Sequence, residues 1–475
     1  MMESNIFGRA KEIDILKRSL VSTGSEFIAV YGRRRVGKTF LVKELLGNSF
    51  VFYATGILDG NMAVQRENFN DEIENFGGRN LPRATDWRGA FANLNRLIEQ
   101  SDREAKKVVF LDEMPWMATA NSDFLSALDY FWNRWASTRH DVLLIVCGSA
   151  TSWIIDKIVN GVGGLHNRLT RQMMLRPFSL GESEGFCQSR GISISKYQHI
   201  EAYMMFGGIP YYLSLMDERL SLYQNIDTLY FEHDAPLRNE YDNLYRSLFR
   251  KADRHIQVIE ALAQKGKGLT REELVGATGL TDGGGLTKVL EDLDNNGFIR
   301  VYRAFGKKAK GRIYQLMDPF TLFHLRFAER RATFSDRYWL QFVLTPAYHA
   351  WSGIAFERVC MQHISQIKQA LGISGVLTEI SAWRSREEDP GAQIDLVIDR
   401  HDRTVNLCEM KFASTELTVD KRLAESLRSK RAAFLSETGT DKSAATTLIS
   451  PLGIRSNKYS GEIHSSVSAA DLFAN

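Results

Sequence analysis

Apolar residues in the first third of the chain fall into two kinds of segment, continuous runs and stretches with a helical period. The continuous runs, which predict buried strands, are residues 27–31, 50–53, 107–111 and 142–146. The periodic stretches, which predict amphipathic helices, are residues 10–20, 63–75 and 87–100. Strands that alternate with helices indicate a parallel sheet with both faces covered. We therefore expect an α/β core over residues 1–165.

The pattern changes after this core. A helical period dominates residues 166–250, which we expect to form a small helical lid. Residues 251–330 contain three helical stretches and then two strand-like runs, the order of a winged helix-turn-helix. Helical and strand-like patterns mix over residues 335–475. The expected fold class is α/β, in which a parallel-sheet core is followed by a helical lid, a winged helix and a C-terminal α/β domain.

The expected winged helix carries two local signals. Thr270 and Glu273 have the spacing of a capping box, which starts a helix. The turn of the hairpin is basic, and the side chains that could face DNA phosphates are Lys307, Lys308, Lys310 and Arg312. The alternative is a module that packs against the nucleotide domain and touches no DNA.

The most specific motif lies between the first strand and the next helix. Residues 32–39 read G-x-x-x-x-G-K-T, the pattern of a phosphate-binding loop. Its backbone N–H groups and the helix N-terminus would face the phosphates of ATP. Lys38 would reach the β- and γ-phosphates, and the Thr39 hydroxyl would bind Mg²⁺. The residues expected to contact nucleotide here are Gly32, Gly37, Lys38, Thr39 and Phe40.

Polar residues at the ends of two later strands complete a hydrolytic site. Asp112 ends an apolar strand, where a nucleotide enzyme places the carboxylate that organises Mg²⁺. The next residue, Glu113, could orient the attacking water. Ser149 follows the neighbouring strand and could contact the γ-phosphate or the water, although a turn serine is nearly as good an interpretation.

Arginines are needed to stabilise charge on the γ-phosphate. Arg168 and Arg171 follow the glycine-rich break near residue 161. Arg168 is included among the expected catalytic residues, although the sequence leaves open which arginine reaches the γ-phosphate. Whether such an arginine acts within one subunit or across two stays open. Arg33, Arg34 and Arg35 lie inside the loop and are interpreted as solvated or as contacts to neighbouring elements.

A second group of charged residues lies near the C-terminus. Residues 393–398 and 405–412 predict a hairpin in which Asp395 sits opposite Glu409. The two-residue period of a strand places Glu409 and Lys411 on one face. Glu357, on a predicted helix, could supply a third acid. Glu357, Asp395 and Glu409 are therefore candidate Mg²⁺ ligands, and Lys411 could position a water for phosphodiester hydrolysis.

Composition narrows the functional classes only slightly. The 475 residues carry a net charge of +3, so any nucleic-acid binding must use local patches. The four cysteines, with no C-x-x-C pair, fit reduced thiols and argue against a cysteine zinc site. No run reaches the roughly 18 apolar residues that span a bilayer. We expect a cytoplasmic protein without a membrane segment.

Five motifs together resemble the archaeal-type AAA ATPases, which also occur in bacteria and are related to signalling NTPases with numerous domains. They are residues 7–12, 32–39, 110–113, 147–149 and 207–213. The resemblance covers most of residues 5–330. It implies that Arg9 lies near the adenine and that the turn containing Pro210 belongs to a lid over the nucleotide. It supplies no substrate.

The C-terminal acids resemble the D…E-x-K core of restriction-endonuclease-like nucleases. Residues 351–435 also look like a domain often fused to archaeal-type ATPases and proposed to be nuclease-like. The chain departs from that pattern because Gln393 and Ile394, rather than a proline, precede Asp395. A degenerate domain that binds nucleic acid or protein without cleavage is the alternative.

Two functions therefore remain in view. The first is an ATP-hydrolysing protein that acts on DNA and cuts or holds it with its C-terminal domain. The second is an ATP-dependent switch whose C-terminal domain recruits a partner without cleavage. Either form could be a homo-oligomer. A kinase or transporter motor fits poorly, because no acceptor-pocket motif or membrane segment accompanies the loop.

Overall fold

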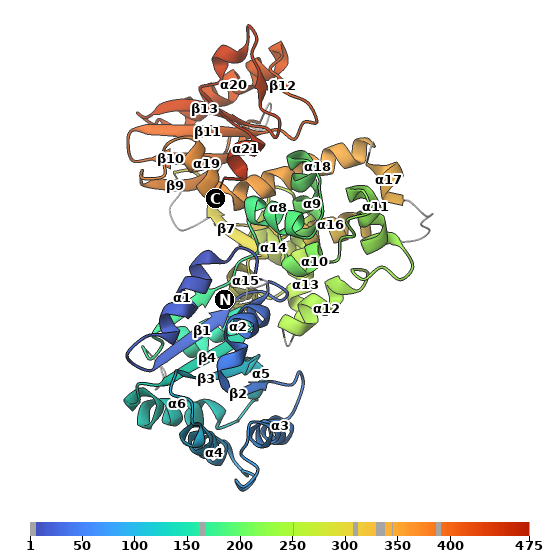
Figure 1. Ribbon diagram of the computed structural model, residues 1–475. Helices are drawn as coiled ribbons and strands as arrows, with labels where there is room; N and C mark the ends of the chain where they lie inside the picture. The colour runs from blue at the N-terminus through green and yellow to red at the C-terminus, as the bar shows by residue number, and fades with distance from the viewer. Residues whose placement is uncertain are drawn as a thin grey trace. The chain divides into compact units, whose positions relative to one another are not determined.

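The protein is described by a computed structural model that covers residues 6–161, 167–249, 251–306, 312–328, 338–343, 345–385 and 391–474. It divides into two compact units (Figure 1). Unit one is Met1–Arg176 with Ser247–Arg250, and unit two is Pro177–Arg246 with Lys251–Asn475. Within the described ranges, no helix is both long and apolar enough to cross a membrane.

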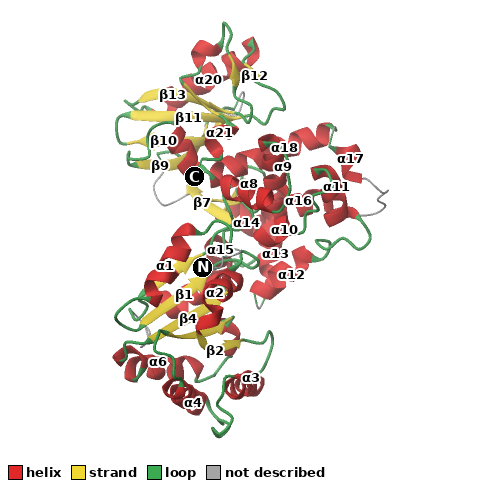
Figure 2. Cartoon of the chain, in the orientation of Figure 1, coloured by secondary structure: helices red, strands yellow, loops and turns green. Residues whose placement is uncertain are grey.

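Unit one is built on a sheet whose strands are drawn as yellow arrows in Figure 2. The sheet is parallel and five-stranded, in the order β2-β3-β4-β1-β5. Its strands are β1 (Glu26–Tyr31), β2 (Phe50–Thr55), β3 (Lys107–Asp112), β4 (Val142–Gly148) and β5 (Arg171–Met174). The principal helices are α1 (Ala10–Leu20), α2 (Lys38–Leu46), α3 (Met62–Asn75), α4 (Trp87–Gln100) and α6 (Phe124–Arg134). The predicted parallel α/β core is confirmed, and so are the four strands and three helices predicted in it. Strand β5 was missed because it is a short edge strand whose first two residues are exposed.

Three of the four continuous apolar runs become strands that are buried on both faces, whereas the run at residues 50–53 forms the partly buried edge strand β2. Every residue of β3 and β4 is buried. Phe69, Trp87, Phe91 and Phe124 join α3, α4 and α6 in one aromatic cluster, with ring centroids between 4.8 and 6.4 Å apart. A strand that is covered on both faces needs apolar side chains at nearly every position, so the strands of a parallel sheet have continuous apolar sequences.

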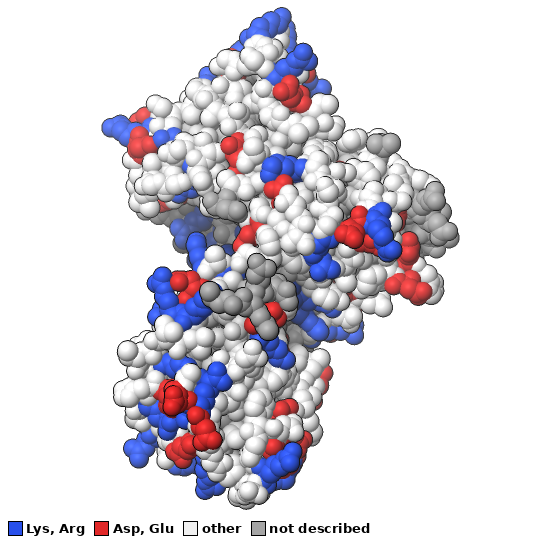
Figure 3. Space-filling model, in the orientation of Figure 1, with Lys and Arg blue, Asp and Glu red and all other residues white. Residues whose placement is uncertain are grey.

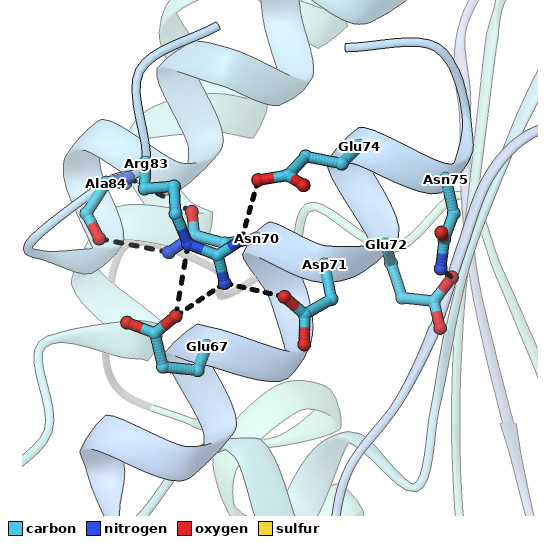
Figure 4. A network of polar contacts seen from close by, with 8 residues as sticks. All are labelled: Glu67, Asn70, Asp71, Glu72, Glu74, Asn75, Arg83 and Ala84. Atoms are coloured by element: carbon cyan, nitrogen blue, oxygen red, sulfur yellow. Dashed lines mark hydrogen bonds and ion pairs between the residues drawn. The ribbon is translucent and has the colours of Figure 1, made fainter. Parts of the chain in front are cut away.

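A guanidinium holds the connection between α3 and α4 (Figure 4). Arg83 forms ion pairs with Glu67, Asp71 and Glu74, whose N–O distances are 2.5, 2.6 and 2.6 Å. Asn70 fastens the same connection by exchanging two hydrogen bonds of 3.1 Å with the backbone of Ala84. Each exposed ion pair is weak on its own. Together they join Arg83 to three carboxylates of α3, which fixes the path of the connection between α3 and α4.

The first part of unit two is helical. It contains α8 (Leu180–Ser189), α9 (Lys196–Phe206), α10 (Pro210–Ser214) and α11 (Leu222–Ile226). Serine capping boxes start α8, α9 and α11. Gly208 between α9 and α10 has φ 66°, and a Cβ there would lie 2.3 Å from the carbonyl oxygen of Phe178, so only glycine fits the turn.

Three helices and a small antiparallel sheet follow, in the order that the sequence predicts. The helices are α13 (Ala252–Gln264), α14 (Arg271–Thr278) and α15 (Gly284–Asn295), and the sheet is β6 (Leu269–Thr270), β8 (Arg312–Leu316) and β7 (Ile299–Arg303) in that spatial order. The predicted capping box is confirmed, because Glu273 N–H donates to Thr270 Oγ1 at 3.2 Å and Thr270 N–H donates to Glu273 Oε2 at 2.7 Å. Arg312 is exposed at the start of β8, whereas Lys307, Lys308 and Lys310 lie outside the described residues.

The C-terminal part of unit two holds a mixed five-stranded sheet in the order β15-β13-β11-β10-β9. Its strands are β9 (Thr378–Arg384), β10 (Gln393–Arg400), β11 (Thr404–Met410), β13 (Ser443–Ile449) and β15 (Ser465–Val467). The predicted hairpin is confirmed as β10 and β11, which are antiparallel. Helices α18 (Pro346–Gln362) and α20 (Lys421–Thr438) pack against β11 and β13 respectively.

Two buried histidines tie stability of unit two to pH. His363 Nε2 accepts a hydrogen bond from Leu180 N–H at 2.9 Å, and its Nδ1 lies 2.7 Å from the carbonyl oxygen of Val359. This pairing requires the neutral ring. Burial lowers the pKa of His363 and that of His199 to about 4. In the unfolded chain both histidines have ordinary pKa values near 6.5. Between that pH and about pH 4 the unfolded chain therefore binds protons that the folded protein does not bind.

We expect the free energy of unfolding of unit two to fall between pH 7 and pH 5 by roughly 2 kcal/mol per histidine. The loss begins as pH drops through the unfolded pKa and stops below the folded value of about 4. Urea unfolding followed at several pH values measures it. His199→Phe should remove about half of the dependence, since His199 is buried against Phe473. A slope that this variant leaves unaltered would contradict the assignment.

Candidate functional site

The phosphate loop connects β1 to α2 and is pinned to β5. Gly37 has φ 90° and precedes the first residue of α2, and Gly32 has φ 144°. Leu175 N–H, just after β5, donates to Tyr31 O at 2.8 Å. A Cβ at Gly32 would lie 2.2 Å from the carbonyl oxygen of Leu175. The loop can therefore take this path only with glycine at its start.

Lys38 fills the centre of the loop. Its side chain is buried, and Nζ donates to the carbonyl oxygens of Gly32 and Arg33, each at 2.9 Å. The third hydrogen bond goes to Ser149 Oγ at 3.0 Å. All three N–H donors of the ammonium are thus directed within the loop and toward the end of β4. This is the place where anionic phosphate oxygens could replace carbonyl acceptors.

Ser149 bridges Lys38 and Glu113. Ser149 Oγ donates to Glu113 Oε1 at 2.6 Å, and Ser149 N–H donates to Glu113 Oε2 at 3.0 Å. The strand order explains this position, because β4 lies between β1 and β3. A residue that follows β4 must sit between the loop after β1 and the acids after β3. Both oxygens of Glu113 are consequently fixed by one residue.

Thr39 and Asp112 form the oxygen pair that could hold Mg²⁺. Thr39 Oγ1 donates to Asp112 Oδ2 at 2.9 Å. Burial and the charge of Glu113 raise the pKa of Asp112, against the effect of the Thr39 hydrogen bond. A hydroxyl and a buried carboxylate are donors that suit Mg²⁺, and a cation there would offset the unfavourable burial of the carboxylate. The two residues therefore fit the predicted ion.

The remaining nucleotide contacts predicted from sequence are distributed over both units. Arg9 is buried with φ 58°, and its Nη2 donates to Val36 O at 3.2 Å, so it supports the loop from outside. Phe40 is 52% exposed on α2. Pro210 is the first residue of α10 in unit two. The adenine contact of Arg9 and the lid role of Pro210 stay predictions.

The position of Arg168 bears on one form of its expected role, which is action within its own subunit, while action across two subunits stays a prediction. Strands β1 and β5 are parallel, and Thr170 N–H donates to Phe27 O, which lies at the start of β1. Arg168 therefore lies at the amino-terminal edge of the sheet, whereas the phosphate loop leaves the carboxyl edge after Tyr31. The strand length between these edges is roughly 10 Å or more. In this arrangement Arg168 does not reach the phosphate site of its own subunit.

Sequence reasoning overlooked Arg176. Arg176 follows β5 at the carboxyl edge of the sheet, directly after Leu175. Burial raises the pKa of the Tyr31 phenol, and the positive charge of Arg176 partly opposes this effect. The signal that could have found it is its position after a strand, but β5 was not recognised. Arg33 is 5% exposed, so of its two interpretations burial agrees with contacts to neighbouring elements and not with a solvated side chain.

In unit two, Glu409 lies between two lysines. The β10–β11 register begins with the pair of Leu396 and Cys408, so Asp395 and Glu409 are the next residues on the two strands. The pairing of Asp395 with Glu409 stays a prediction, because β10 is irregular between Ile394 and Val397. Glu409 Oε1 lies 2.8 Å from Lys411 Nζ, and Glu409 Oε2 lies 2.7 Å from Lys430 Nζ on α20. Burial opposes ionisation, but the two ammonium groups prevail and lower the pKa of Glu409. The second lysine could not be assigned from sequence spacing.

Glu357 shares the electrostatic environment of Asp395 and Glu409. Burial raises its pKa to about 7, and the negative charge of Asp395 adds to the effect. Yet no three His, Cys, Asp or Glu side chains in the described ranges are arranged to hold a metal ion. The predicted ligand set of Glu357, Asp395 and Glu409 is therefore close enough to interact but is not assembled as a metal centre.

Comparisons with known proteins place an ATPase domain in the first half of the chain. Residues 6–216 match the family described as an ATPase domain predominantly from Archaea. An uncharacterized protein of Methanocaldococcus jannaschii, MJECL04, is 24% identical over 414 residues, which cover 85% of this chain and 87% of the relative. The resemblance to archaeal-type ATPases is thus confirmed for residues 6–216.

Two solved structures are similar at low identity. The Walker-type ATPase PABY2304 of Pyrococcus abyssi is 18% identical with a TM-score of 0.49, and covers 68% of this chain and 97% of its own. The ORC2 protein of Aeropyrum pernix is 15% identical with a TM-score of 0.39, and covers 68% of this chain and 95% of its own.

We expect Gly32→Ala to weaken ATP binding by about tenfold to a hundredfold, because the added Cβ meets the Leu175 carbonyl and the φ of Gly32 suits only glycine. Isothermal calorimetry with ATP and Mg²⁺ measures the change. Gly24→Ala is the matched control, since a Cβ at that position has no atom within 4 Å. Equal affinities for the two variants would show that the loop tolerates a different path.

Proposed function

We propose that unit one binds ATP with Mg²⁺ at the phosphate loop and hydrolyses it. The observation that carries this proposal is the continuous chain from Lys38 through Ser149 to Glu113, beside the Thr39–Asp112 pair. It joins a phosphate-binding cation, a candidate magnesium pair and a candidate base at one edge of the sheet. The family match over residues 6–216 supports the same conclusion.

In this proposal each polar residue of the site has a separate role. Lys38 neutralises phosphate oxygens as charge develops on them, and Thr39 with Asp112 would hold Mg²⁺, which supplies further charge stabilisation. Glu113 would accept a proton from, or orient, the attacking water. Ser149 holds the Glu113 carboxylate through both oxygens, so it is a positioning residue for the base.

Glu113→Gln should lower the turnover number for ATP by about a hundredfold or more while ATP remains bound, because the amide cannot accept the proton from water. Steady-state phosphate release and calorimetry with ATP measure the two properties separately. Glu104→Gln, an exposed glutamate outside the site, is the matched control. Unchanged turnover in Glu113→Gln would remove this residue as the base.

We further propose that ATP hydrolysis serves an action on DNA by unit two. Helices α13–α15 with the β6-β8-β7 sheet have the content of a winged helix, whose hairpin could contact phosphates. On the face drawn in Figure 3, basic and acidic side chains of the described residues are interspersed. Binding would therefore depend on a local patch.

Cleavage of DNA by the C-terminal sheet is the first form of this proposal. It is favoured by the position of Asp395 and Glu409 on adjacent antiparallel strands and by the lysine beside Glu409. A non-cleaving switch is the second form. It is favoured by the two lysines that already neutralise Glu409 and by the unassembled set of acids.

Two substitutions decide between these forms. Glu409→Ala and Lys411→Ala should each reduce Mg²⁺-dependent plasmid nicking by at least about a hundredfold if cleavage occurs. ATP turnover should stay unchanged, since these residues belong to unit two. Gel analysis of supercoiled plasmid with Mg²⁺ or Mn²⁺ and ATP measures nicking. Wild-type protein that never nicks single- or double-stranded DNA would support the switch.

A further inference from the structure

The end of strand β7 joins the edge of the C-terminal sheet. Ala304, which follows β7, forms an isolated parallel bridge with Ala382 of β9. Phe305 N–H donates to the carbonyl oxygen of Ala382 at 2.8 Å. The Phe305 ring also packs on Phe434 of α20, with ring centroids 4.9 Å apart. The β7–β8 hairpin is therefore attached to β9 at one residue, Ala382.

Ala382 is also the residue opposite an irregularity that contains Asp395. The register of β10 on β9 pairs Ile394 with Trp383 and Val397 with Ser381. Asp395 and Leu396 therefore share a single partner, Ala382, which is the count of a β-bulge. Bulges bend a strand and change the direction of a side chain. The direction of Asp395 consequently depends on how β9 runs at Ala382.

The same hairpin contacts the helix that carries Glu357. Arg358 on α18 is 2% exposed, donates through Nε to Leu316 O of β8 at 3.0 Å and also donates to Gly266 O. Its Nη1 lies 3.8 Å from Glu357 Oε2. Arg300 of β7 donates through Nη1 to Met361 Sδ of α18 at 2.8 Å. Both acids thus have neighbours that the hairpin holds.

The junction with β9 borders two hollows of the surface. They measure about 440 and 530 Å³, and both are lined by Tyr302, Ala304, Phe305 and Gly306. The Phe305 side chain packs against the buried cluster that contains Trp383 of β9 and Ile394 and Val397 of β10. The hairpin end is therefore attached through the Ala304–Ala382 bridge and the Phe305 ring.

We propose that the β7–β8 hairpin positions Asp395 and Glu357 relative to each other, with Phe305 acting through Ala382 and Arg358 acting on Glu357. This inference rests on the acid site of the proposed function. Because one hairpin contacts the supports of both acids, a displacement of the hairpin changes their geometry together. A partner that binds the hairpin would thereby alter the C-terminal site without touching it.

Phe305→Ala tests the connection between the β7–β8 hairpin and β9. The substitution removes the ring contact with Phe434 and leaves Arg358 in place. We expect amide hydrogen exchange in β10 to become about tenfold faster, the effect of losing one aromatic contact and weakening one hydrogen bond. Mass spectrometry of peptides that cover residues 393–400 measures it. Phe186→Ala is the matched control, because it removes an aromatic contact with Phe178 in the helical part of unit two.

A disulfide across the bridge supplies the rescue. Ala304→Cys with Ala382→Cys, added to Phe305→Ala, should restore slow exchange in β10 when oxidised and lose it again on reduction. The four native cysteines are buried, so they should not compete for the new thiols. Thr418→Cys with Arg455→Cys, a paired position of β12 (Leu417–Thr418) and β14 (Ile454–Arg455) outside the sheet that contains β10, should give no rescue.

The two proposals fail in different ways. If wild-type protein nicks DNA, Phe305→Ala should lower the cleavage rate and shift its pH profile, and the oxidised bridge should restore both. If wild-type protein never nicks, cleavage is refuted while exchange in β10 still tests the hairpin. Exchange in β10 that is the same in Phe305→Ala and in wild type would overturn the positioning role. Rescue by the distant disulfide as well would also overturn it.

Discussion

The ammonium of Lys38 is the contact around which unit one is arranged. It is held by two carbonyls of its own loop and by Ser149, which also holds Glu113. A buried ammonium must have such partners, because desolvation without them is costly. The buried ammonium therefore requires hydrogen-bond partners on several sides. The glycines let the loop close around Lys38, and the strand order brings Ser149 to it. In the proposed function, phosphate binding and water activation would both take place at this contact.

That requirement also explains the tight attachment of the loop to β5. The Leu175 carbonyl leaves no space for a side chain at Gly32, and Leu175 N–H is bonded to Tyr31. Arg176 is the next residue, so an arginine stands at the carboxyl edge next to the loop. The positive charge of Arg176 at the carboxyl edge of the sheet is therefore placed by β5, an edge strand that contributes little to the hydrophobic core.

Unit two follows a different design. Its acids are supported through neighbours: Glu409 by two lysines, Glu357 by Arg358, and Asp395 by a bulge opposite Ala382. Each support is a polar or single-residue contact, and the hairpin β7–β8 touches two of them. The unit-one site differs, because the fully buried strands β3 and β4 end beside it.

Local sequence determined the elements that depend on few neighbours in the chain. Unbroken apolar runs identified four strands, and a capping box located the start of α14. The strand-like runs at residues 393–398 and 405–412 identified the β10–β11 hairpin. The glycine loop predicts the position of a nucleotide site. These features arise from backbone geometry and burial, which act over a few residues. Only tertiary structure decided which edge of the sheet Arg168 occupies, that Ser149 bridges two strands, and that Lys430 reaches Glu409. Such contacts join residues distant in sequence, and their geometry follows from strand order and helix packing, which no local pattern encodes.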